Sequence, residues 1–73
     1  MLQETVAHPN WENATPEELR VAMEAAPTRR GYLRLNAIRL LLLGYSRAQV
    51  AQITNRSDRM VRLWIELFNR GGI

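Results

Sequence analysis

The chain has 73 residues, a formal net charge of +3, no cysteine and a single histidine. A domain of this length buries only about 60% of the surface of its unfolded chain, so its stability is marginal. Neither a disulfide nor a metal site can supplement it, because cysteine is absent and one histidine cannot form a ligand set. We therefore expect a compact core without a metal or other cofactor. The sequence leaves open whether a homodimer or another bound partner adds stability.

Charge is divided unevenly along the chain. Residues 1–27 hold five glutamates against one arginine, a net charge of −4, whereas residues 28–73 hold nine arginines against two acids, a net charge of +7. Every basic side chain is arginine, whose guanidinium pairs bidentately with phosphates and base edges. A solvated helical surface is the ordinary use of such charge, but a positive block of this size favours a polyanionic partner.

No segment resembles a membrane span or an export signal. The apolar run at residues 40–43 is far shorter than the ~20 residues that cross a bilayer. Residues 1–5 lack the basic start and apolar run of a signal peptide. We expect a cytoplasmic protein with no membrane partner.

Residues 1–14 show no sustained periodicity, and His8-Pro9-Asn10 has the composition of a turn or loop. We predict a flexible arm over this range. Trp11 stands alone among polar neighbours. We expect it to pack back onto the core, with contact to a partner as the alternative.

A leading helix is predicted over residues 15–27. Thr15 can cap it, Pro16 suits the first helical position, and Glu18 stands where a capping box requires a carboxylate. Pro27 ends the helix, since the residue before a proline is disfavoured in the helical region. Its apolar stripe consists of Leu19, Ala22, Met23 and Ala26.

Residues 28–31 are interpreted as a link to a second helix over roughly residues 32–43. Arg34 and Arg39 lie on its polar side, and Gly44 follows as a left-handed cap. The inward face is formed by Leu35, Ile38, Leu41 and Leu42, broadened by Leu33 and Ala37.

A short third helix is capped by Ser46 and runs to about Ile53. We expect Val50 and Ile53 to face inward, with Ala51 at the contact with the following helix. Asn55 then occupies the turn, because asparagine tolerates a positive φ better than most residues.

Ser57 caps a fourth helix over about residues 58–69. Its apolar residues have the i, i+3, i+4, i+7 spacing of one helix face: Val61, Trp64, Ile65 and Phe68. Nowhere does the alternating pattern of a strand appear. The sequence therefore predicts an all-α fold, with one short helix followed by a three-helix unit over residues 28–73.

The last two helices have the features of a helix-turn-helix, which presents its second helix to the DNA major groove. We expect this recognition helix over about residues 57–69, with four base-reading residues facing outward: Asp58, Arg59, Arg62 and Leu63. An arginine can pair with guanine O6 and N7. Asp58 either accepts from cytosine N4 or stabilises the helix start and orients Arg59 or Arg62. The plainer alternative, an exposed i, i+4 ion pair, fits Arg62 with Glu66.

Phosphate contacts are expected at the positive N-terminal ends of the last two helices. Arg47 and Arg56 flank these ends, and Arg39 extends the basic surface. The expected phosphate-binding residues are Ser46, Arg47, Arg56, Ser57 and Arg39. Arg29 and Arg30 lie in the same basic half, but the pattern does not fix their facing.

From about residue 35 onwards the chain has a leucine-rich helix, Gly-x-Ser, a Val-Ala pair, Ser-x-x-x-Val-x-x-Trp and Phe-x-x-Gly-Gly. These motifs fall at Gly44, Ser46, Val50, Ala51, Ser57, Val61, Trp64, Phe68, Gly71 and Gly72. In this pattern the chain resembles the N-terminal DNA-binding domain of bacterial insertion-sequence transposases of the mariner-like superfamily. Asn55 stands where that family has glycine, and Arg56 where it has an apolar residue. The resemblance implies a homeodomain-like helix-turn-helix that binds the terminal repeat of a transposable element.

We expect no catalysis by this chain, because metal-dependent strand transfer needs a carboxylate cluster and Asp58 is its only aspartate. The expected partner is double-stranded DNA, which implies association with the nucleoid, and no small-molecule substrate is expected. One alternative is a stand-alone transcriptional regulator that uses the same helix pair. Another is a protein-interaction module, in which the acidic residues 1–27 bind a basic partner or cover the chain's own basic face.

Overall fold

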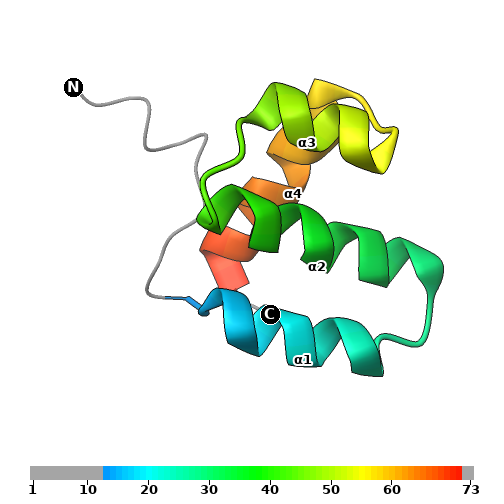
Figure 1. Ribbon diagram of the computed structural model, residues 1–73, viewed down its shortest axis with the longest axis vertical. Helices are drawn as coiled ribbons and strands as arrows, with labels where there is room; N and C mark the ends of the chain where they lie inside the picture. The colour runs from blue at the N-terminus through cyan, green and yellow to red at the C-terminus, as the bar shows by residue number, and fades with distance from the viewer. Residues whose placement is uncertain (1–12, 72–73) are drawn as a thin grey trace.

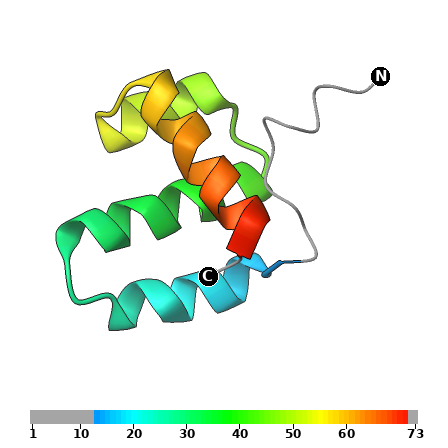
Figure 2. The same ribbon diagram turned by 180° about the vertical axis from the view of Figure 1, so that it is seen from behind.

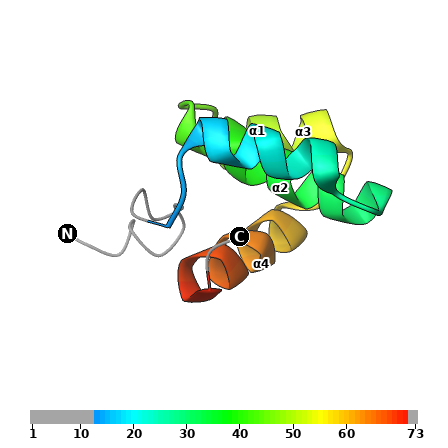
Figure 3. The same ribbon diagram turned by 90° about the horizontal axis from the view of Figure 1, so that it is seen from below.

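The computed structural model describes residues 13–71, which contain helices and no strand. The helices are α1 (Pro16–Ala25), α2 (Arg29–Leu42), α3 (Arg47–Thr54) and α4 (Asp58–Gly71) (Figure 1). α1, α2 and α3 lie side by side, and α4 crosses behind α2, as the reverse view in Figure 2 shows. Seen from below in Figure 3, α4 forms a second layer. α2 packs against each of the other three helices, and α3 packs against α4. The predicted all-α fold is confirmed.

α1 begins at the predicted cap. The Thr15 side chain accepts a hydrogen bond from the Glu18 N–H at 3.1 Å, and the Glu18 carboxylate accepts one from the Thr15 N–H at 2.9 Å. This reciprocal capping box satisfies two N–H groups that a helix start leaves unpaired. Leu19 and Met23 are buried, so the predicted stripe is the face that packs into the core.

α2 begins at Arg29, three residues earlier than predicted. The predicted link is wrong because Thr28 is an N-cap: its side chain accepts a hydrogen bond from the Gly31 N–H at 3.0 Å. Gly31 therefore lies inside the first turn of a helix rather than in a loop. Arg29 and Arg30 become the first two residues of α2.

The other end of α2 is as predicted. Gly44 has a φ of 111°, in the region that favours glycine. Its N–H donates to the Leu41 carbonyl at 3.1 Å, and the Tyr45 N–H donates to the Leu40 carbonyl at 3.0 Å. These two bonds close the last turn in a Schellman motif and direct the chain toward α3.

The core is supplied mainly by α2 and α4, and the predicted inward residues of both helices are buried, except Leu33, which is half-buried against the core. On α3 the prediction for Ile53 is wrong, because this side chain is 54% exposed. Val50 and Thr54 are the buried residues of α3, and the Thr54 hydroxyl donates to the Val50 carbonyl at 2.8 Å. The inward face of this short helix therefore follows an i, i+4 spacing, which leaves Ile53 on the outer side.

The segment before α1 is tied to the end of α4. Ala14 is buried, and the Asn13 side-chain amide donates to the Phe68 carbonyl. Both residues fall within the range that the sequence assigned to the arm. The rest of that range, including Trp11, lies outside the described residues.

Candidate nucleic-acid interface

The turn between α3 and α4 is three residues long and depends on one left-handed residue. Asn55 has a φ of 57° and a ψ of 44°, the conformation expected for it from sequence. This lets the Arg56 N–H donate to the Ala51 carbonyl at 2.9 Å, which ends α3. Ser57 follows immediately and accepts a hydrogen bond from the Met60 N–H at 3.1 Å, which starts α4. The predicted caps of both helices are present, since Ser46 and Gln49 form a capping box at the start of α3.

α4 has one buried face and one exposed face. Val61, Trp64, Ile65 and Phe68 are buried. The four predicted base-reading residues are all exposed, and with Ser57, Met60 and Glu66 they line a shallow depression of about 550 Å³ on the outer surface. The structure therefore brings the predicted outward residues together on one face of the N-terminal half of α4.

Arg59 and Arg62 have no partner within residues 13–71. Neither guanidinium makes a hydrogen bond or an ion pair in this range. The i, i+4 pair between Arg62 and Glu66, the plainer alternative, is thus not formed. Both arginines keep all their N–H donors available for an external acceptor.

Asp58 has a different partner from those expected. Its Oδ1 atom lies 3.8 Å from Nε of Arg47, rather than pairing with Arg59 or Arg62. This contact joins the first residue of α3 to the first residue of α4. The Arg47 side chain is 34% exposed, and its Nη1 atom is buried without a hydrogen-bond partner. A buried donor without an acceptor is costly, so the Nη1 group costs the folded state some stability.

Arg56 is held by the turn itself. Its Nη1 atom donates to the Asn55 carbonyl at 3.1 Å and approaches the Thr54 carbonyl at 3.5 Å. These are the last carbonyls of α3, where a positive charge is favourable. The remaining N–H groups of this guanidinium make no hydrogen bond with residues 13–71.

Arg39 stands apart from the other predicted phosphate contacts. It lies on α2, is half-buried, and donates to the Asn36 side chain at 3.4 Å. Its charge also acts on α1: hydrogen bonding and charge from Arg20 hold the pKa of Glu17 below its usual value, and Arg39 lowers it further. Ser46, Arg47, Arg56 and Ser57 lie at the starts of α3 and α4 or in the turn between them, whereas Arg39 is close to the acidic first helix.

The sequence did not fix the facing of Arg29 and Arg30, and it placed Arg34 only on the polar side of its helix. In the structure these three exposed arginines lie on the first half of α2, beside α4. Thr28 is the signal that could have found them, because a threonine cap starts α2 early enough to include Arg29 and Arg30.

Two helices joined by a tight turn, the second with its arginines facing outward, define a helix-turn-helix, a class of DNA-binding domain. Comparison with protein-family models agrees, since residues 28–73 match the family described as homeodomain-like domain. The match covers more than half of the chain, and the chain belongs to this family. Searches of curated proteins and of solved structures found no match. Among the described helices, none is long and apolar enough to cross a membrane.

Proposed function

We propose that the protein binds double-stranded DNA sequence-specifically, with α4 in the major groove. The observation that carries this proposal is a pair of arginines, Arg59 and Arg62, on the exposed face of a helix whose opposite face forms the core. Neither has a partner among residues 13–71. One bidentate arginine–guanine pair contributes about 1–3 kcal/mol of discrimination between bases. Leu63 is 45% exposed beside them and offers an apolar contact for a thymine methyl group.

Contacts to DNA phosphates would fix the position of α4 along the duplex. The first N–H groups of α3 and α4, which follow Ser46 and Ser57, point out of positive helix ends. Arg47 and Arg56 flank those ends and are held by contacts to Asp58 and to the turn carbonyls. Arg39 is left out of this footprint because it lies toward α1.

The cellular role that we propose is recognition of the terminal repeat of a bacterial transposable element, with strand cleavage done by a separate catalytic domain. The motifs from Gly44 to Gly72 support it. A stand-alone transcriptional regulator is the alternative. A regulator that binds as a symmetric dimer would select a palindrome with half-sites about one helical turn apart, whereas the transposase role predicts a single asymmetric site.

Selection of bound duplexes from a random pool tests the proposal. The wild-type protein should enrich one short motif containing guanine, and Arg59→Ala and Arg62→Ala should each relax the preference at one position of it. Arg20→Ala is the matched control, since it removes one arginine from α1, where Arg20 pairs with Glu17 and Glu24. It should enrich the wild-type motif unchanged. Absence of any enriched motif, or equal loss in all three variants, would contradict base reading by α4.

A further inference from the structure

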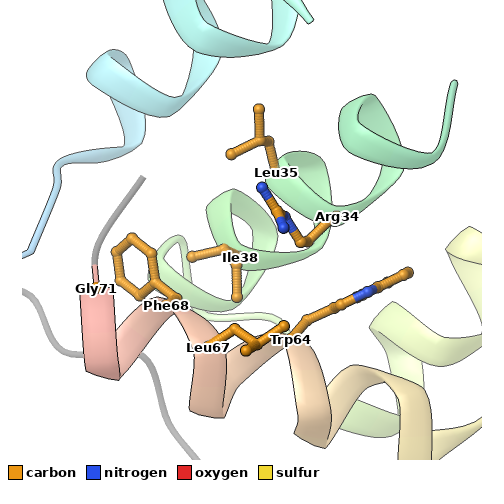
Figure 4. Close-up of a pocket in the computed structure, with 7 residues that line it drawn as sticks. All are labelled: Arg34, Leu35, Ile38, Trp64, Leu67, Phe68 and Gly71. Atoms are coloured by element: carbon orange, nitrogen blue, oxygen red, sulfur yellow. The ribbon is translucent and has the colours of Figure 1, made fainter. Parts of the chain in front are cut away.

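A trough runs between α2 and α4. Three depressions of about 230, 480 and 400 Å³ all include Trp64 in their lining. Figure 4 shows the end nearest the C-terminus of α4, where Arg34, Leu35 and Ile38 of α2 lie opposite Trp64, Leu67 and Phe68 of α4. We call the three depressions together the α2–α4 trough. Apart from arginines and Thr28, the residues that line it are apolar or glycine.

The rim of the trough is basic. Four arginines line it, three from α2 and one from the turn before α4: Arg29, Arg30, Arg34 and Arg56. Among residues 13–71, no acidic residue lines any of the three depressions. The side chains of the three α2 arginines make no hydrogen bond or ion pair with the described part of the chain. Arg56 is held through Nη1 by the Thr54 and Asn55 carbonyls, and its other N–H groups are not used in these two contacts.

The start of α2 carries positive charge, which destabilises the N-terminal end of a helix. The N-terminal end of a helix is partly positive and favours acidic residues. α1 follows this rule with Glu17 and Glu18 in its first turn, whereas α2 has Arg29 and Arg30 as its first two residues and no acid in its first turn. The backbone N–H groups of Arg29 and Arg30 also lack partners within the part of the chain that the structure describes, since the Thr28 side chain accepts only from the N–H of Gly31. Violations of a local stability rule are expected where a surface serves a ligand, and two arginines at a positive helix end favour an anion.

The trough adjoins the outer face of α4, because Met60 and Leu63 line both. A helix in the major groove has one phosphate backbone on each side of it. We propose that the α2–α4 trough holds the phosphodiester backbone of one DNA strand, with Arg29, Arg30 and Arg56 on its phosphates and the apolar floor against its deoxyriboses. This inference rests on the proposed function and extends the DNA footprint from α3 and α4 to the start of α2.

The salt dependence of DNA binding by the full chain tests this inference. Affinity for the selected duplex and for a scrambled duplex is measured by fluorescence anisotropy over a salt series. The double variant R29Q/R30Q should flatten the slope of log K against log salt by about 2, since each phosphate contact contributes about 0.9. Its affinity should fall by the same factor on both duplexes, so the preference between them is kept. R20Q, which removes one arginine from α1, should keep the wild-type slope.

Folding of the variant is not at risk, because R29Q/R30Q removes two positive charges from a positive helix end. Its melting temperature should equal or exceed that of the wild type. An unchanged slope in R29Q/R30Q, with wild-type preference intact, would overturn the trough assignment and leave the proposed function standing. Tighter DNA binding by R29Q/R30Q would also overturn it, since the trough would then hold an acidic competitor such as residues 1–12, which contain Glu4 and Glu12. If the wild type shows neither sequence preference nor salt dependence, both proposals fail.

Discussion

The arginines near the start of α4 fall into two groups by their contacts. Arg47 and Arg56 are held by the protein, the first 3.8 Å from Asp58 and the second by the turn carbonyls. Arg59 and Arg62 are exposed and without partners in the described residues. A guanidinium already held in place loses less conformational freedom when it meets a phosphate. The contacts therefore support separate positioning and reading roles for the two groups.

Asp58→Asn separates the two roles considered for this residue. Because Asp58 faces Arg47, we expect it to position that arginine rather than to read a base. The variant should bind every duplex more tightly, since one negative charge leaves the interface, and should keep the wild-type preference. Its unfolding free energy should change by less than about 1 kcal/mol, as for other exposed pairs. Anisotropy on selected and scrambled duplexes measures both effects. Loss of preference at a single cytosine would assign base reading to Asp58 instead.

Asn55 is the residue on which the turn depends most. At a φ of 57° an alanine costs about 1–2 kcal/mol, whereas glycine adopts this conformation freely. Asn55→Ala should therefore lower the unfolding free energy by about 1 kcal/mol, and Asn55→Gly, the matched control, should change it by less than half of that. Urea denaturation followed by circular dichroism measures both values. Equal loss in the two variants would show that φ is not what selects asparagine here.

At the level of helices, local signals predicted most of the fold. The caps at Thr15, Ser46 and Ser57 and the breaks at Pro27 and Gly44 were read correctly, because each acts on residues within one turn of itself. The α2 start was missed because glycine and proline near Thr28 are also typical of a loop. Periodicity likewise identified the buried face of α4, the helix with the clearest apolar stripe.

What the sequence could not predict depends on contacts between elements. The inward face of α3 is set by how a helix of two turns fits against α2 and α4, so Ile53 was misplaced. The approach of Arg47 to Asp58 joins the starts of two helices and has no signal in spacing. The exposure of Arg59 and Arg62 could be predicted from the apolar stripe on α4. The α2–α4 trough could not be predicted, because it exists only where the two helices pack together.

Substitution of Trp64 tests whether this side chain holds α4 against the rest of the fold. Its side chain is 5% exposed, and truncation of a buried aromatic residue costs about 3–5 kcal/mol. We expect Trp64→Ala to be largely unfolded, given the marginal stability of so short a chain. Leu67→Ala is the control on the same helix, since Leu67 is 41% exposed and should cost less than about 1.5 kcal/mol. Equal melting temperatures for the two variants would show that Trp64 is not a core residue.

Over the whole molecule, acidic and basic surfaces are segregated. α1 carries Glu17, Glu18 and Glu24 and packs against α2, whereas the arginines without a partner in the described residues lie along α4 and the start of α2. Figure 3 shows α4 as a layer separate from α1. Such a distribution orients a polyanion toward the α4 side during encounter and repels it from the α1 side.

A domain this small should be stabilised strongly by its partner. A ligand at 100 times its Kd adds about 2.7 kcal/mol to the folded state. One kcal/mol shifts the melting temperature of a 60–100-residue domain by about 4–8 °C. The selected duplex should thus raise the melting temperature by more than about 10 °C, and the scrambled duplex at the same concentration by less. A thermal melt followed by circular dichroism compares them, and equal shifts would argue against sequence-specific binding.

The central claim, that α4 enters the major groove through its arginines, is tested most directly by guanine N7 methylation interference. N7 lies in the major groove and is an acceptor for arginine. We predict that methylation of at least one guanine in the selected duplex blocks binding of the wild-type protein, and that this guanine ceases to matter for Arg59→Ala or Arg62→Ala. Wild-type binding that is unaffected by methylation at every guanine N7 would contradict the account.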